Sequence, residues 1–89
     1  MNEVKIKAII DHFNEGNFLQ AKKVAWELIQ TNPNDSRVWK ILGDTQIKLN
    51  EEFTQSFLKI VEIYSEQEKY DKAIKVLKDL IKMKPNNLI

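Results

Sequence analysis

Hydrophobic residues recur every three or four positions along most of the chain, which is the spacing of one face of an α-helix. The pattern falls into five segments, at about residues 3–14, 18–30, 37–49, 52–66 and 70–83. We therefore expect an all-α fold of about five helices. The fourth segment is apolar around most of its circumference, so we expect it to be the most buried helix.

Short polar stretches separate most of these segments. Gly16 suits the left-handed conformation that ends many helices, and Pro33 cannot continue the second helix. No glycine or proline separates the third segment from the fourth. Two separate helices and one bent helix are therefore both compatible with residues 37–66.

The chain contains an internal repeat. A shift of 52 positions aligns a helix that begins with an aromatic residue, carries alanine three positions later and ends in a Pro-Asn turn. Repeats of this kind are typical of stacked helical units, each of which leaves an apolar face for its neighbour to cover. The aligned pairs are Phe18 with Tyr70, Ala21 with Ala73 and Pro33 with Pro85.

Between the two copies, Trp39, Leu42 and Gly43 form a W-x₂-L-G sequence, and Phe57 and Tyr64 occupy the corresponding aromatic positions one helix later. With the repeated alanines and prolines, these residues resemble the signature of the tetratricopeptide repeat family. The resemblance covers nearly the whole chain. It implies a single domain over residues 1–89, built as a right-handed α-solenoid of antiparallel helical hairpins.

The spacing of the repeat departs from the family pattern. The family unit has about 34 residues, whereas the two matching units are 52 residues apart, which is about one unit plus one extra helix. We interpret the helix that contains Trp39 as a first helix whose partner has been lost or merged. The fourth helix would then pack against both the third and the fifth.

Composition narrows the classes of partner. The 89 residues include 14 Lys and Arg against 13 Asp and Glu, and no apolar run approaches the ~20 residues of a membrane span. Lysines in the last helix alternate with Asp71 and Asp79, which is typical of a solvated face. We expect neither nucleic acid nor membrane as the partner, and a cytoplasmic location.

Few residues suggest catalysis. The chain has no cysteine, and its one histidine, His12, lies in a predicted helix at a position where the family has tyrosine. Glu51 and Glu52 lie where helices end, and solvated charges are normal there. We therefore predict that the chain is not an enzyme and that it holds no metal or cofactor.

The resemblance also implies a concave groove, lined by the first helix of each unit, that receives a partner. In family members that hold the C-terminal tails of chaperones, charged residues clamp the carboxylate. Here Ile6, Ile10, Ile41 and Gln55 occupy most of those positions, and Lys59 alone keeps the charge. The predicted groove residues are Ile6, Ile10, Phe13, Asn14, Arg37, Lys40, Ile41, Asp44, Ile47, Lys48, Gln55, Lys59, Glu62 and Glu66.

An apolar groove of this kind suits an amphipathic helix of another protein. We therefore predict a protein–protein interaction module that acts as an adaptor or scaffold. Other roles remain open. The same residues could mediate self-association of the chain or stacking within a longer scaffold, or they could be ordinary core residues.

Overall fold

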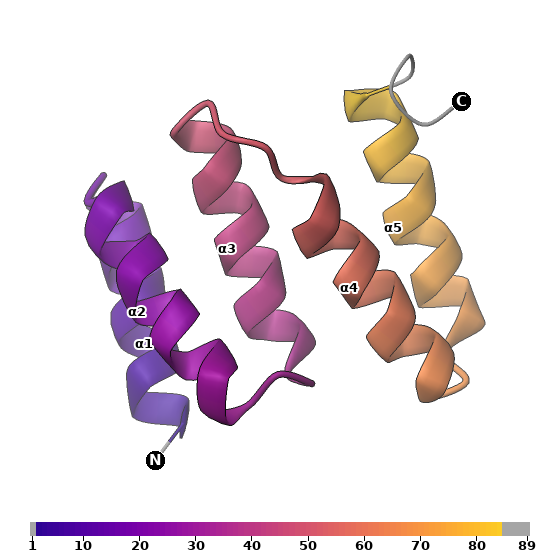
Figure 1. Ribbon diagram of the computed structural model, residues 1–89, viewed down its shortest axis with the longest axis horizontal. Helices are drawn as coiled ribbons and strands as arrows, with labels where there is room; N and C mark the ends of the chain where they lie inside the picture. The colour runs from indigo at the N-terminus through magenta and orange to yellow at the C-terminus, as the bar shows by residue number, and fades with distance from the viewer. Residues whose placement is uncertain (1, 85–89) are drawn as a thin grey trace.

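A computed structural model of the protein describes residues 2–84; Met1 and residues 85–89, which include Pro85, lie outside the described part. The described residues form five α-helices that run alternately up and down (Figure 1). The all-α fold is confirmed. The helices are α1 (Asn2–Asn14), α2 (Phe18–Thr31), α3 (Ser36–Lys48), α4 (Thr54–Glu66) and α5 (Tyr70–Met83).

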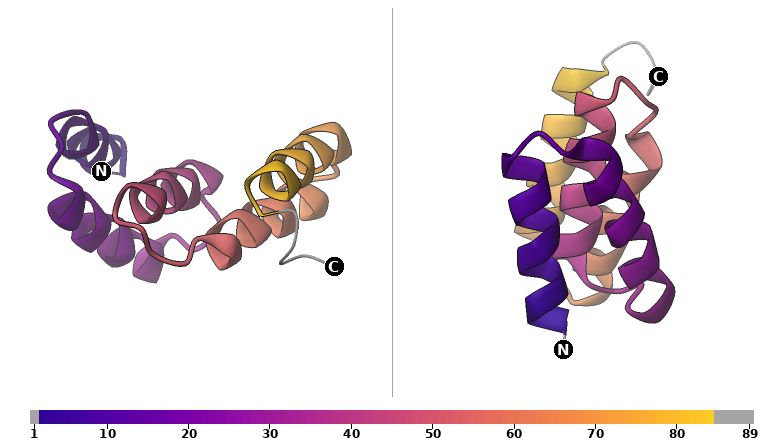
Figure 2. Two further views of the ribbon diagram at one scale, coloured as in Figure 1. Left: turned by 90° about the horizontal axis from the view of Figure 1, so that it is seen from above. Right: turned by 90° about the vertical axis from the view of Figure 1, so that its left-hand side faces the viewer.

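The helices are arranged in two layers. Seen from above, α1, α3 and α5 lie in one layer and α2 and α4 in the other, so the chain passes from layer to layer at every turn (Figure 2). Each helix packs against the next, and α1 also contacts α3. No contact joins α3 to α5 within residues 2–84. The array is therefore closed by a same-layer contact at its N-terminal end and open at its C-terminal end.

Two hydrophobic clusters form the core. The larger one joins α1, α2 and α3 through fully buried residues such as Ile9, Ala25 and Leu42. The smaller one joins α4 to α5 through Phe57, Ile60 and Leu80. The Trp39 side chain packs against both clusters, and α3 thus connects the two halves of the array.

α3 and α4 approach closely where Gly43 faces Phe57. A Cβ atom placed on Gly43 would lie only 2.7 Å from the Phe57 ring, so only glycine fits at this crossing. Next to it, the buried Ser56 hydroxyl donates a hydrogen bond to the Gln46 side-chain oxygen at 2.7 Å. A small residue and one buried polar pair therefore determine how α4 lies against α3.

The structure shows that the third and fourth helices are separate. Asn50 adopts a left-handed conformation, with φ of 60°, and asparagine tolerates this better than most residues. α4 begins two residues later than predicted. The Glu52 carboxylate accepts a hydrogen bond from the backbone N–H of Thr54, so Glu52 caps the helix from outside it.

The expected double role of α4 is confirmed, because α4 packs against both α3 and α5. The expectation that it is the most buried helix holds in part, since α4 has fewer exposed residues than any other helix but no more fully buried ones than α2 or α3. α2 and α3 bury as many residues as α4, and Leu58, Val61 and Tyr64 of α4 remain partly exposed. Among the described residues α4 makes no contact with α2, and Leu58 lines the hollow between these two helices.

Candidate functional site

The α1–α3 groove is the hollow between these two helices of one layer. Its volume is about 420 Å³, and its apolar lining comes from three isoleucines. Ile10 is 41% exposed and Ile41 is half-buried, whereas Ile6 belongs mainly to the core. The complete lining is Glu3, Ile6, Lys7, Ile10, Arg37, Lys40 and Ile41.

Charged side chains form the rim of the α1–α3 groove. The Arg37 guanidinium lies 2.8 Å from a Glu3 carboxylate oxygen and 2.8 Å from an Asp35 oxygen, and so ties α1 to the start of α3. The hydrogen bond from Arg37 lowers the pKa of Asp35, while the two carboxylates raise the pKa of Arg37. Lys40 pairs with Asp44 at 2.7 Å. Arg37 and Lys40 at the rim already pair with carboxylates of this chain. The exposed apolar surface of the isoleucine floor is therefore the part of the groove most available to a partner.

Five of the predicted groove residues come together in this hollow: Ile6, Ile10, Arg37, Lys40 and Ile41. Other predicted residues on the same helices lie outside its lining. Phe13 packs on the core and meets the Phe18 ring edge-on at a centroid distance of 5.3 Å. Ile47 and Lys48 are exposed near the far end of α3, and Asp44 faces Lys40.

A second hollow, the α2–α4 groove, lies between these two helices of the other layer, with part of α3 as its floor. Its volume is about 320 Å³. Lys59, Glu62 and Gln55 line this groove, although they were expected beside Ile10 and Ile41. The layer change at α4 is the physical reason: α4 lies opposite α1 and α3, so its side chains cannot line their groove.

Trp26 was not anticipated as a site residue. It is 42% exposed, lines the α2–α4 groove and meets the Trp39 ring edge-on at 6.0 Å between centroids. The Trp39 indole N–H donates to the carbonyl oxygen of Pro33 at 2.7 Å, which fixes that ring at the groove wall. The available signal was the position of Trp26 off the stripe formed by Ala21, Ala25 and Leu28, with the polar residues Lys22 and Gln30 four positions before and after it.

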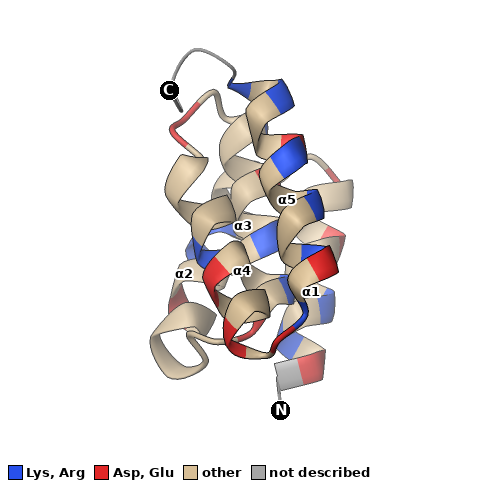
Figure 3. Ribbon diagram, turned by 90° about the vertical axis from the view of Figure 1, so that its right-hand side faces the viewer, with Lys and Arg blue, Asp and Glu red and all other residues tan. Residues whose placement is uncertain are grey.

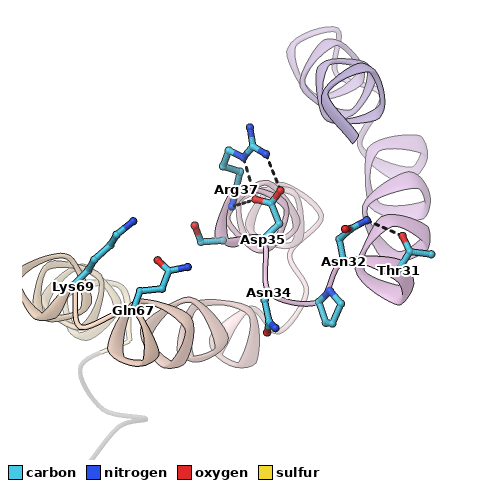
Figure 4. Close-up of a pocket in the computed structure, with 9 residues that line it drawn as sticks. Thr31, Asn32, Asn34, Asp35, Arg37, Gln67 and Lys69 are labelled. Carbon is cyan, nitrogen blue, oxygen red and sulfur yellow. Dashed lines mark hydrogen bonds and ion pairs between the residues drawn. The ribbon is translucent and has the colours of Figure 1, made fainter. Parts of the chain in front are cut away.

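A third hollow, of about 570 Å³, lies between the α2–α3 turn and the α4–α5 turn (Figure 4). Its lining is polar and is dominated by the turn residues from Thr31 to Arg37, with Gln67 and Lys69 opposite. Asp35 and Arg37 face each other there, and Asp35 also caps α3 by accepting from the Arg37 backbone N–H at 3.0 Å. These side chains have structural roles, so this hollow is a weaker candidate than the α1–α3 groove.

The backbone conformation at the C-terminal ends of the helices follows the internal repeat. α1, α3 and α4 each end at a residue with positive φ: Gly16 at 80°, Asn50 at 60° and Glu68 at 58°. In each case the next residue donates its N–H to a carbonyl five positions earlier, as in a Schellman motif. Gly16 and Asn50 lie 34 positions apart, and Asn50 and Glu68 lie 18 apart.

α2 and α5 end in a different and shared way. Asn32 and Lys84 both have φ of −138°, and their N–H groups donate to Leu28 and Leu80, respectively. Each of these two helices also starts two positions after a left-handed residue, Gly16 or Glu68. By the geometry of their ends, α1, α3 and α4 are first helices of a repeat, and α2 and α5 are second helices.

Residues 54–87 match the sequence profile of the tetratricopeptide repeat, a span that begins with α4 and includes α5. Residues 54–87 therefore form a tetratricopeptide repeat. Searches of curated proteins and of solved structures each found no match. Tetratricopeptide repeats are generally protein-binding modules and use the surfaces of the helical array to bind.

α4 and α5 span the matched repeat. The ends of α1 and α2 have the same geometry as those of α4 and α5, and α3 ends like a first helix but has no second helix of its own. The signature residues lie where the repeat requires them. Ala21 and Ala73 are buried at equivalent positions of the two second helices, and Gly43 and Phe57 are buried where α3 meets α4. Leu42 is buried in the cluster that joins α1, α2 and α3. Trp39 and Tyr64 are half-buried.

Residues 2–84 contain no group of three or more histidine, aspartate or glutamate side chains that could hold a metal ion. None of the helices in the described part of the chain combines the length and apolarity needed to cross a bilayer.

Proposed function

We propose that this chain is an adaptor that captures an amphipathic helix of a partner protein in the α1–α3 groove. The observation that carries this proposal is the pair of accessible isoleucines, Ile10 and Ile41, on two helices of the same layer. A helix laid along this groove would place apolar side chains at three- and four-residue spacing against them.

The charged residues at the rim would orient the bound partner helix more than they would strengthen its binding. Lys7 pairs with Asp11 at 3.0 Å and Lys40 with Asp44 at 2.7 Å, so both signs of charge border the apolar floor. Charged groups at the edge of an interface chiefly affect the rate and register of association. We therefore expect the apolar contacts to determine most of the affinity.

The experiment selects helical peptides from a displayed library against the wild-type chain and then measures their affinities by calorimetry. Ile41→Glu should weaken binding at least about tenfold, which corresponds to about 1.4 kcal/mol, because it places a charge on the apolar floor. Leu19→Glu is the matched control, since Leu19 is 69% exposed on α2 and lies outside the groove.

Circular dichroism must show the same helicity for the wild-type chain and both variants. Equal affinities of the wild-type and Ile41→Glu chains for every selected peptide would contradict the proposal. A loss of affinity caused by Leu19→Glu alone would assign binding to a different surface.

A further inference from the structure

α5 exposes an apolar stripe at the C-terminal end of the array. Tyr70, Ile74 and Ile81 are 56%, 48% and 50% exposed, and Leu77 between them is half-buried. Their spacing of four, three and four residues is that of the a and d positions of a coiled-coil heptad. The stripe thus runs the length of the helix on one side.

The equivalent side of α2, the matching helix of the internal repeat, is packed against other helices. At the positions of α2 that lie 52 residues earlier, Ala25 and Ile29 correspond to Leu77 and Ile81. Both are buried in the cluster that α2 forms with α1 and α3. Lys22, which corresponds to Ile74, reaches Glu51 just beyond the end of α3 at 2.8 Å. α5 packs against α4 alone among the described elements, so its equivalent face is uncovered.

In head-to-tail stacking, α1 of a second copy would cover the stripe, but α1 lacks the residues that α3 uses to cover α2. α3 presents Val38 and Leu42 to the core it shares with α2, and the residues 34 positions earlier on α1 are Val4 and Ala8. Their neighbour Asp11 is charged and exposed and corresponds to the buried Thr45. Head-to-tail stacking would therefore bring the Asp11 carboxylate against the stripe where the repeat has a buried threonine, and would also generate an open filament.

The charges beside the stripe favour a two-fold pairing instead. Asp71 and Lys78 occupy the e positions of the heptad and flank the exposed Ile74 (Figure 3 shows the charged residues of α5 at this end). In an antiparallel pair of helices, e positions face e positions, so Asp71 of each copy would meet Lys78 of the other. In a parallel pair the e positions would face Ala73 and Leu80, which are already buried within their own chain.

We propose that a second copy of this chain covers the stripe, with the two α5 helices antiparallel about a two-fold axis. Ile74 then packs opposite Leu77 of the partner copy, and Tyr70 opposite Ile81 of the partner copy. Two Asp71–Lys78 ion pairs flank this apolar seam. The surface used is distinct from the α1–α3 groove, so dimerisation leaves the proposed partner site open.

Sedimentation equilibrium of the whole chain tests this pairing. The wild-type protein should approach twice the 10.5 kDa mass of one chain as its concentration rises. Ile74→Glu should stay monomeric at the same concentrations with unchanged circular dichroism, because Ile74 is half exposed in the single chain.

A charge exchange tests the orientation. Asp71→Lys should weaken dimerisation at least tenfold, and adding Lys78→Asp should restore it, because only the antiparallel pairing brings these two positions together. Asp79→Lys is the control, since Asp79 lies outside the seam and pairs with Lys75 in its own chain. A wild-type chain that stays monomeric to millimolar concentration, a mass that grows without limit, or a double variant that remains as weak as Asp71→Lys would each overturn the proposal.

Discussion

At the scale of single residues, the contact between Gly43 and the Phe57 ring controls the path of the chain. The ring is buried, with 4% of its surface exposed, and lies where a side chain at position 43 would need to be. The close approach lets Gln46 and Ser56 form their hydrogen bond across the same crossing. A larger residue at position 43 would therefore strain both the packing and the polar pair.

Gly43→Val should lower the free energy of unfolding by about 2 kcal/mol, since overpacking typically costs ~1–3 kcal/mol and valine gains little helix propensity over glycine. Urea denaturation followed by circular dichroism measures the change. Lys48→Val is a matched control on the exposed end of the same helix and should change stability by less than about 0.5 kcal/mol. Equal stability of the two variants would show that α3 and α4 are not held at this distance.

A second residue-scale feature is the ion pair that joins the start of α4 to the end of α5. The Lys84 ammonium lies 2.7 Å from a Glu52 carboxylate oxygen and 5.0 Å from the centroid of the Phe53 ring. Hydrogen bonds from Lys84 and Thr54 lower the pKa of Glu52 to about 2, from an ordinary value of 4.5. A carboxylate whose pKa is lower in the folded state stabilises the fold above its unfolded pKa.

The contribution of Glu52 should therefore be complete above pH 4.5 and should disappear as the pH falls towards 2. We expect the wild-type chain to unfold at a higher temperature than Glu52→Gln near neutral pH, and the difference to shrink steadily below pH 4.5. Thermal unfolding at a series of pH values measures it. A difference that stays constant from pH 6 to pH 2 would exclude this ion pair as its source.

At the scale of helices, the hydrophobic pattern of the sequence is sufficient to locate all five, and the observed bounds differ from the predicted ones by at most two residues. The end of α3 was less certain, because its stop signal is a left-handed Asn50 in place of a glycine or proline. The layer occupied by α4 could not be predicted. Its apolar residues surround most of the helix, so the pattern gives no single inward face.

Glu68→Gly tests the helix ends that define the repeat. A non-glycine residue in the left-handed conformation costs ~1–2 kcal/mol, and the flexibility of glycine in the unfolded chain offsets part of the gain. We expect the free energy of unfolding to rise by about 0.5–1 kcal/mol in urea denaturation. The neighbouring variant Gln67→Gly should instead be destabilising, because Gln67 has a φ of −88° that any residue adopts. Destabilisation by Glu68→Gly would contradict the geometry assigned to this turn.

At the scale of the whole molecule, the change of layer at α4 divides the expected single groove in two. Only part of the predicted set on α1 and α3 gathers in the α1–α3 groove, with Ile10 and Ile41 at its centre, whereas Lys59 and Glu62 line the α2–α4 groove with Trp26. The apolar identity of the candidate groove residues was predictable from helical spacing. Their division between two grooves depends on the layer that α4 occupies: its ends resemble those of α1 and α3, but it lies in the other layer with α2.

The most direct test of the proposed function is a nuclear magnetic resonance titration of the ¹⁵N-labelled chain with the tightest selected helical peptide. The account predicts that the largest amide shift changes fall on α1 and α3 around Ile6, Ile10 and Ile41, and that Trp26 and Lys59 shift little. Shift changes centred on Trp26, Trp39 and Lys59 would place the partner in the α2–α4 groove and would contradict the assignment of the binding surface.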